Sequence, residues 1–305
     1  MSELSGVLAV FKPAGFTSHD VVAKARRIIG MKRIGHAGTL DPQVTGVLPL
    51  CLGRATRIVE YIQELPKEYI ATVRLGLSTD TEDITGTVLE QLDEVKVSEA
   101  DVRRVLDSFT GVISQVPPMY SAVKVDGKRL YELARAGKTV ERKSREVEIY
   151  ELEATELNLN QPHPEITFRV RCSKGTYIRT LCVDIGQALA VPAVMVKLTR
   201  TMSAGIPVSR CLTLEQIAEH REAGTLQSVL IPADEAISHL PRHIVTEEKV
   251  RAAISGQRLS SRLVAPEVKV SGHLRLYAPG GDFLGIFERD EDGAIAPVKV
   301  FAQND

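Results

Sequence analysis

Residues 165–172, with the sequence EITFRVRC, carry an apolar side chain at every second position. Successive side chains of a β-strand point to opposite faces, so this alternation predicts a strand with one buried face. The residues expected on that face are Ile166, Phe168, Val170 and Cys172. A Lys-Gly turn follows, and the next segment, YIRTLCVDIGQALA, has helical spacing. A half-buried strand that leads directly into a helix restricts the chain to folds that combine sheet and helix.

Strands and helices are mixed along the rest of the chain without strict alternation. Residues 18–29 have helical spacing and end at Gly30, and a second helix is expected between Ser98 and Gly111. Thr213 and Gln216 have the spacing of a capping box. This mixture favours an α+β fold, in which helices flank a mainly antiparallel mixed sheet, over a doubly wound parallel sheet.

The character of the sequence changes near residues 239–243. Beyond that point TEEKVRAAISGQ predicts one short helix, and HLRLYAPGGDFLGIFERDEDGAIAPVKVF predicts two or three short strands joined by Gly-Gly and Asp-Gly turns. A chain of 305 residues exceeds the usual size of one domain. The sequence therefore predicts a large domain of residues 1–240 and a small β-rich domain of residues 241–305.

The charged residues are unevenly distributed, although the net charge is only −1. Residues 1–57 carry eight Lys or Arg and three Asp or Glu, and residues 169–200 carry six against one. Residues 60–101 hold eleven acidic and three basic groups. Clusters of positive charge in a nearly neutral chain fit the binding of a polyanion along one face, unless folding disperses them.

Several classes of protein are disfavoured by what the sequence lacks. The first apolar run is six residues long, too short for a signal peptide or a membrane span, so a cytoplasmic protein is expected. The four cysteines form no CxxC pair, and the seven histidines follow no metal-binding pattern. We therefore expect reduced thiols and no metal. No coiled coil or apolar patch predicts a dimer, so a monomer is expected.

The stretch HAGTLDP, residues 36–42, places a carboxylate directly before a proline and close to several basic residues. Pro42 fixes its own φ and pushes Asp41 toward an extended conformation, which displays the carboxylate on a stiff backbone. Gly38 permits a tight bend or the close approach of another segment. Taken alone, the stretch could equally be a turn or a helix start, because Asp-Pro is common in both.

Five separated stretches resemble the TruB family of tRNA pseudouridine synthases, bacterial type. They are FKPAGFTSHDVV, GHAGTLDPQVTGVLPLCLGRATR, KEYIATVRLGLSTDTEDITG, QVPPMYSAVKVDGKRLYELARAG and SKGTYIRTLCVDIGQAL. They stand in the family's order over residues 10–200, and the tail beyond residue 240 resembles a PUA-type RNA-binding module. One departure is Thr199 in VKLTRTMSAG, where a second arginine is more usual. That departure puts one phosphate contact in doubt.

The resemblance implies the isomerisation of uridine 55 in the T-loop of tRNA to pseudouridine, without a cofactor. It assigns the role of nucleophile to Asp41 and that of its partner to Arg179. A carboxylate in a closed pocket resists ionisation unless a cation lies beside it, and the planar arginine fork suits that role. We therefore expect a direct, partly buried ion pair between Asp41 and Arg179, beside Tyr69 and Leu198.

The target base lies inside a folded RNA loop, so it must be flipped out to react. By resemblance, Tyr69 stacks on the flipped base and handles a proton, and Tyr177 and Leu198 form the pocket wall. His36 would fill the gap that the base leaves in the T-arm stem-loop. Phosphate contacts, which position the RNA without reading its sequence, are expected from Lys12, Arg33, Arg54 and Lys174.

Two other classes of function compete with this interpretation. A glycoside hydrolase would need a second carboxylate near Asp41, for which Asp80 and Asp83 are the candidates. A non-catalytic RNA chaperone would need only the basic faces and the tail. Help with tRNA folding could also accompany the enzyme activity, and a substitution of Asp41 would separate chemistry from binding.

Overall fold

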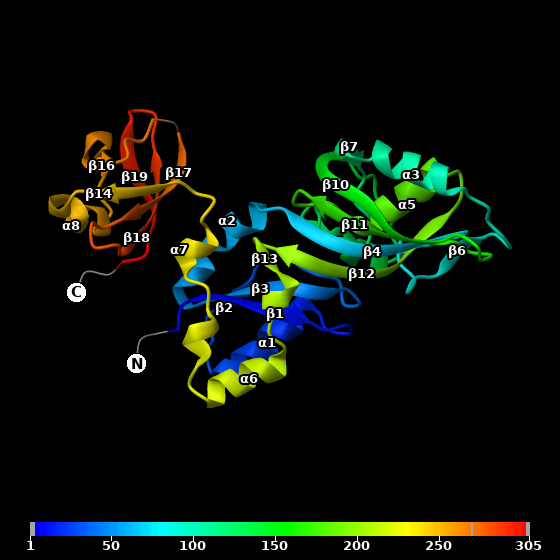
Figure 1. Cartoon of the computed structure of the whole chain (residues 1–305), viewed down its shortest axis with the longest axis horizontal. Helices are drawn as coiled ribbons and strands as arrows, with labels where there is room; N and C mark the ends of the chain where they lie inside the picture. Colours follow the sequence, from blue (N-terminus) through cyan, green and yellow to red (C-terminus); the bar gives the residue numbers. More distant parts are fainter. Residues whose placement is uncertain (1–3, 270, 303–305) are drawn as a thin grey trace.

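Two β-sheets organise the computed structural model of the chain, which describes residues 4–269 and 271–302. A nine-stranded sheet spans the middle and one end of the molecule, and a six-stranded sheet forms a separate body near the C-terminus (Figure 1). The fold class is α+β, as the sequence predicts.

The nine-stranded sheet has the order β1-β3-β12-β4-β11-β10-β7, with β2 and β13 paired at the side. Its pairings are antiparallel except that between β12 and β3. Its strands are β1 (Gly6–Lys12), β2 (Ile34–His36), β3 (Thr45–Leu52), β4 (Lys67–Leu75), β7 (Gly111–Gln115), β10 (Arg145–Asn158), β11 (Glu165–Cys172), β12 (Ala193–Ser203) and β13 (Ile206–Pro207).

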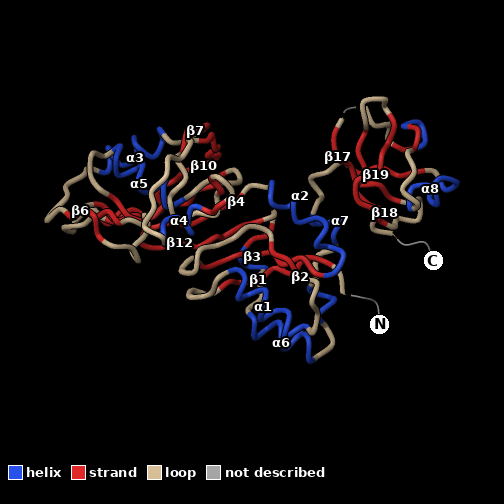
Figure 2. Tube along the Cα trace, turned by 180° about the vertical axis from the view of Figure 1, so that it is seen from behind, coloured by secondary structure: helices blue, strands red, loops and turns tan. Residues whose placement is uncertain are grey.

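The helices cover this sheet in two groups (Figure 2). One group packs against β1 and β3, and consists of α1 (Ser18–Ile29) and α6 (Leu214–Glu222). The other packs against β10, β12 and their neighbours, and consists of α3 (Glu99–Ser108) and α5 (Ile178–Ala188). The predicted caps are present: Ser98 caps α3, Gly30 ends α1 in a left-handed conformation, and Thr213 and Gln216 form the capping box of α6.

The predicted alternation in β11 is confirmed. Its four apolar side chains, Ile166, Phe168, Val170 and Cys172, are all buried against α3 and α5. The pairing of β11 with β4 places Tyr69 opposite Val170. Tyr69 is buried in the same apolar cluster, which also contains Leu40 and Val44 of the loop that carries Asp41.

The six-stranded sheet has the order β15-β19-β18-β17-β14-β16. Three of its strands match the sequence-based expectation: β17 (Gly272–Tyr277), β18 (Phe283–Arg289) and β19 (Ala294–Val300). The others are β14 (Arg242–Val245), β15 (Leu259–Ser260) and β16 (Val264–Ala265), and the short helix is α8 (Val250–Ile254). Strands of two to four residues are too short to show an alternating pattern, which explains why the sequence did not reveal them.

The small sheet packs against a strip of the large domain. The strip consists of a 3-10 helix (Gly53–Ile58), α2 (Val59–Glu64) and α7 (Ala233–Ala236). Phe301 and Ile286 share one apolar cluster with Ile58 and Ile62. Arg54 donates a hydrogen bond of 2.7 Å to the Phe301 carbonyl, and Arg57 donates one to the Val300 carbonyl. Packing and charged hydrogen bonds therefore hold the two bodies together.

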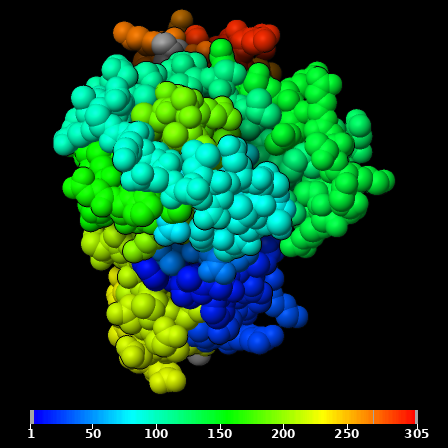
Figure 3. Space-filling view, turned by 90° about the vertical axis from the view of Figure 1, so that its right-hand side faces the viewer, coloured from blue at the N-terminus to red at the C-terminus, as the bar shows by residue number. Residues whose placement is uncertain are grey.

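An insertion with little packing of its own lies between β7 and β10. It contains the hairpin of β8 (Lys124–Val125) and β9 (Lys128–Arg129), followed by α4 (Leu130–Arg135). It stands out from one side of the large domain, beside the hairpin of β5 (Leu77–Thr79) and β6 (Val88–Gln91) (Figure 3). The segment before the insertion, residues 116–123, passes beside the pocket described next.

Candidate active site

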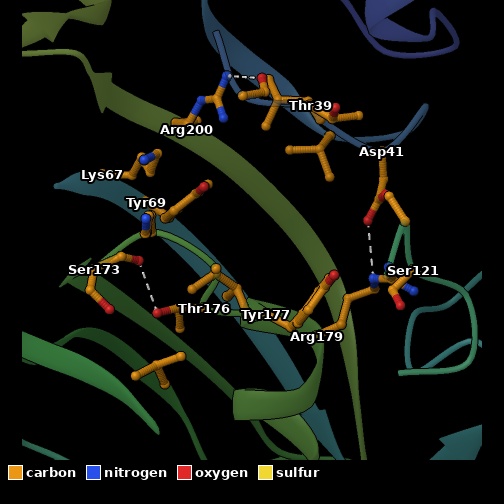
Figure 4. Close-up of a pocket in the computed structure, with 18 of the residues that line it drawn as sticks. Thr39, Asp41, Lys67, Tyr69, Ser121, Ser173, Thr176, Tyr177, Arg179 and Arg200 are labelled. Carbon is orange, nitrogen blue, oxygen red and sulfur yellow. Dashed lines mark hydrogen bonds and ion pairs between the residues drawn. The ribbon is translucent and has the colours of Figure 1, made fainter. Parts of the chain in front are cut away.

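A cavity of about 670 Å³ opens between the two helix-covered parts of the large sheet. The loop between β2 and β3 contributes Asp41, and the start of α5 contributes Tyr177 and Arg179. Tyr69 comes from β4 and Leu198 from β12. These five expected site residues, from four separate segments, thus line one pocket. Figure 4 labels four of them: Asp41, Tyr69, Tyr177 and Arg179.

The loop that carries Asp41 is fixed from several sides. Pro42 accepts a hydrogen bond from the Gly15 amide at 2.9 Å, and Ser18 Oγ accepts one from the Leu40 amide at 2.9 Å. Gly38 has a φ of +85°, and a side chain there would also meet Arg200, because a Cβ would lie 3.3 Å from its Nη1. The backbone of the stretch HAGTLDP is therefore rigid and holds the carboxylate of Asp41 in a fixed position.

Lys12 also holds this loop in place. The expectation that Lys12 contacts phosphate is wrong. Its side chain is fully buried, and Nζ donates hydrogen bonds to the carbonyls of Pro13, Pro42 and Val44 at 3.0, 2.9 and 2.7 Å. Burial lowers the pKa of Lys12 to about 8, although the charge of Asp41 opposes that shift. Lys12 therefore binds the backbone directly after Asp41, at Pro42 and Val44.

Replacing Lys12 with methionine is expected to lower the free energy of unfolding by about 2–4 kcal/mol, because three carbonyls lose their buried donor. Denaturant unfolding of the two proteins measures the change. A phosphate contact would behave differently: its loss would reduce the salt dependence of RNA affinity by about one unit of slope. An unchanged stability with a reduced slope would contradict the structural role.

Arg179 is held by three separate segments. Its Nε lies 3.0 Å from Asp41 Oδ2, Nη1 donates to the Thr81 carbonyl at 2.9 Å, and Nη2 donates to the Tyr120 carbonyl at 2.7 Å. The Arg179 side chain is 5% exposed, whereas that of Asp41 is 45% exposed. The ion pair expected from the sequence is therefore present. The guanidinium is locked in place while the carboxylate keeps an open side toward the pocket.

The start of α5 is itself positioned by a side chain of β7. Gln115 is buried, and its side chain makes two hydrogen bonds to the backbone of Tyr177. Its Oε1 accepts one from the Tyr177 N–H at 2.8 Å, and its Nε2 donates one to the Tyr177 carbonyl at 3.0 Å. Tyr177 precedes α5, so this contact fixes the helix turn that presents Arg179. The Arg145 guanidinium lies 4.8 Å from the Tyr177 ring centre.

Tyr69 lies among cations at the opposite side of the pocket. Burial raises the pKa of its hydroxyl, and the charge of Arg200 offsets part of that rise. Arg200 is fully buried and donates to the carbonyls of Val47 (2.7 Å) and Gly38 (3.0 Å). Burial also lowers the pKa of Lys67 to about 8, and its Nζ donates to the Leu65 carbonyl at 2.8 Å.

Arg200 and Lys67 were not among the expected site residues. The sequence signal for each was only its position, Arg200 directly after Thr199 and Lys67 two residues before Tyr69. Thr199 itself makes a hydroxyl contact of 2.9 Å with Thr45 between neighbouring strands.

The remaining expected RNA contacts are spread over the surface near the pocket. Lys174 lies at the pocket mouth and pairs with Glu64. His36 is half-buried outside the pocket, and its ring meets that of His19 edge-on at 5.4 Å. Arg33 and Arg54 line a separate cavity of about 390 Å³ beside the end of β19, together with Arg57.

The carboxylates that a glycoside hydrolase would need are used elsewhere. Asp80 Oδ1 accepts a hydrogen bond from the Thr87 amide, and Asp83 Oδ1 accepts one from the Thr85 amide, so both shape the loop before β6. Within the described residues, neither lines the pocket of Asp41, whose carboxylate faces Arg179 instead. This arrangement favours the ion-pair site over the paired-carboxylate site.

In residues 4–269 and 271–302, no group of three or more His, Cys, Asp or Glu side chains is arranged to hold a metal ion. Within the same residues, no helix is both long and apolar enough to cross a membrane.

Comparison with known proteins gives the same family in three stretches between residues 26 and 301. Residues 26–178 match the model of the TruB family pseudouridylate synthase N-terminal domain. Residues 179–238 match the tRNA pseudouridylate synthase B C-terminal domain, and residues 241–301 match the C-terminal domain of pseudouridine synthase II TruB.

Individual relatives are similar over nearly their full length. A tRNA pseudouridine synthase B of Geobacillus thermodenitrificans (strain NG80-2) is 44% identical over 98% of this chain and 100% of its own. The corresponding protein of Bacillus subtilis (strain 168) is 41% identical over 98% of both. One chain of the crystal structure of a Cbf5-Nop10-Gar1 complex superposes with a TM-score of 0.77 at 28% identity, covering 97% of this chain and 85% of that one. The chain belongs to the TruB family of pseudouridine synthases.

Proposed function

We propose that the protein is a tRNA pseudouridine(55) synthase, an isomerase that acts on uridine 55 in the T-loop. The observation that carries this function is the ion pair of Asp41 and Arg179, 3.0 Å apart in a pocket that also contains Tyr69. The relatives named tRNA pseudouridine synthase B support the substrate.

The reaction needs an ionised carboxylate and no group donor. The N1–C1′ bond of uridine breaks, the uracil turns, and C5 forms a new bond to C1′ while the proton of C5 is transferred to N1. Atoms and electrons balance without an oxidant, a reductant or a cofactor. Asp41 acts as the nucleophile, and the Arg179 guanidinium keeps it charged and aimed.

The base must reach Asp41 from within the RNA, so the T-loop uridine is flipped into the pocket. Tyr69 stacks on the base, and Tyr177 and Leu198 form the surrounding wall. His36, on the surface beside the Asp41 loop, takes the place of the base in the T-arm. Arg33, Arg54 and Lys174 contact phosphates and position the RNA.

We assign residues 1–240 to catalysis and residues 241–305 to a PUA-like domain that binds RNA. The basic cavity of Arg33, Arg54 and Arg57 lies where the two meet, so a phosphate there would contact the boundary of both domains. The protein acts as a monomer in the cytoplasm, without a metal. The surface that binds the T-arm also assists tRNA folding.

Conversion of a T-arm hairpin tests the proposed function. Isomerisation leaves the mass of the RNA unchanged, so the product is detected by pseudouridine-specific chemistry at nucleotide 55. A hairpin with cytidine at that position is the control, and we expect the chelator EDTA to leave the rate unchanged. A hairpin that remains unmodified at uridine 55 would contradict the proposal.

Replacing Tyr69 with phenylalanine is expected to reduce turnover about a hundredfold or more while RNA affinity changes only slightly. The ring that stacks on the base is kept, whereas the hydroxyl that transfers a proton is lost. Single-turnover rates and dissociation constants with the same hairpin measure the two effects. A rate close to that of the parent protein would restrict Tyr69 to stacking.

A further inference from the structure

Ser121 carries a buried hydroxyl that the site described above does not use. The residue is 5% exposed and lines the pocket together with Asp41 and Arg179. Its Oγ is fully buried, yet no group in residues 4–269 and 271–302 forms a hydrogen bond with it. Buried hydroxyls nearly always have a partner, so one without a partner on a residue that lines a functional pocket points to a ligand.

The backbone around Ser121 is held in place, so its hydroxyl is not a side chain on a loose loop. The preceding carbonyl, of Tyr120, accepts the 2.7 Å hydrogen bond from Arg179 Nη2. The Ser121 carbonyl accepts a hydrogen bond of 3.1 Å from the Tyr131 amide, and the Leu130 amide donates to the Val123 carbonyl at 2.8 Å. The guanidinium that holds Asp41 therefore also fixes the chain next to Ser121.

The pocket has an aromatic side and a carboxylate side. Figure 4 shows Tyr69 on one side, and Asp41, Arg179 and Ser121 together on the other. A uridine whose base stacks on Tyr69 and whose C1′ faces Asp41 must place its ribose on the carboxylate side. The 2′-hydroxyl is bonded to C2′, the carbon next to C1′, so it lies close to whatever polar group neighbours Asp41.

We propose that Ser121 Oγ forms a hydrogen bond with the 2′-hydroxyl of the flipped nucleotide, and that it thereby selects a ribonucleotide at the target position. The proposal rests on the proposed function, because it needs the uridine in this pocket. The 2′-hydroxyl both donates and accepts, and it is the group by which a protein distinguishes RNA from DNA at one site. A serine hydroxyl has the same two capacities, so the pair is complementary.

The experiment measures binding in the Asp41→Asn background, where the bound nucleotide stays unconverted. Two T-arm hairpins are used, identical except for uridine or 2′-deoxyuridine at position 55. Each is titrated against the background protein and against the protein that also carries Ser121→Ala. We expect the Ser121→Ala change to weaken binding of the uridine hairpin about five- to tenfold and to leave the deoxyuridine hairpin within about twofold.

Thr176→Val in the same background is the matched control. The Thr176 hydroxyl lies in the same pocket but already donates to the Ser173 carbonyl at 3.0 Å. Its loss is expected to change the affinity for both hairpins by the same factor. That result shows that a difference between the hairpins is specific to Ser121.

Equal losses on the two hairpins after Ser121→Ala would overturn the proposal, since a purely structural serine, or one that pairs with residue 41, acts on both alike. The parent protein is tested in parallel for conversion of the uridine hairpin. Absence of pseudouridine there contradicts the proposed function. Conversion combined with equal losses contradicts the assignment of Ser121 alone.

Discussion

Asp41→Asn is expected to abolish pseudouridine formation while RNA affinity stays within about tenfold of the parent protein. An asparagine keeps the shape of the side chain but cannot supply the negative charge that the reaction uses. Affinity comes mainly from phosphate contacts outside the pocket, so it depends little on this one group. Single-turnover conversion and equilibrium binding with one T-arm hairpin measure the two effects separately.

Asp107→Asn is a matched control, because Asp107 is exposed near the end of α3 and does not line the pocket. Its variant should convert the hairpin at the rate of the parent. Turnover by Asp41→Asn near that rate would remove Asp41 from the mechanism. Loss of binding together with turnover would instead make Asp41 a source of affinity.

Arg179→Ala is expected to lower the single-turnover rate about a hundred- to a thousandfold. The change leaves the carboxylate of Asp41 without its cation and removes the donors of the Thr81 and Tyr120 carbonyls. Arg179→Lys keeps the charge but cannot reach three acceptors with a planar fork, so a loss of about ten- to a hundredfold is expected.

Circular dichroism and thermal unfolding of both variants show whether the fold is kept. A folded Arg179→Ala protein with full activity would contradict the role of the ion pair. A lysine variant as slow as the alanine variant would show that the geometry of the guanidinium matters more than its charge.

The sequence was informative where function depends on side chains in contiguous motifs. Asp41 and Arg179 lie far apart in the chain, yet each stands in a motif, and the expected ion pair is present. The strand at residues 165–172 was predictable because its alternation directly reflects burial on one face.

The sequence was misleading or silent where a side chain binds the backbone of a distant segment. A lysine next to a turn suggests a phosphate contact, but Lys12 is enclosed by three carbonyls. Arg200 and Gln115 likewise bind backbone groups of segments that are distant in the sequence. Every residue carries a carbonyl and nearly every residue an amide, so a sequence does not show which of them will meet a given side chain.

The proposed reaction requires that uridine 55 leave the T-loop and lie between Tyr69 and Asp41. A crystal structure of the Asp41→Asn protein with an unconverted T-arm hairpin tests it most directly. We predict a flipped uridine stacked on Tyr69, with C1′ about 3.5 Å from the side chain of residue 41 and Arg179 still beside it. A uridine that remains stacked within the loop, or a base bound outside this pocket, would contradict the claim.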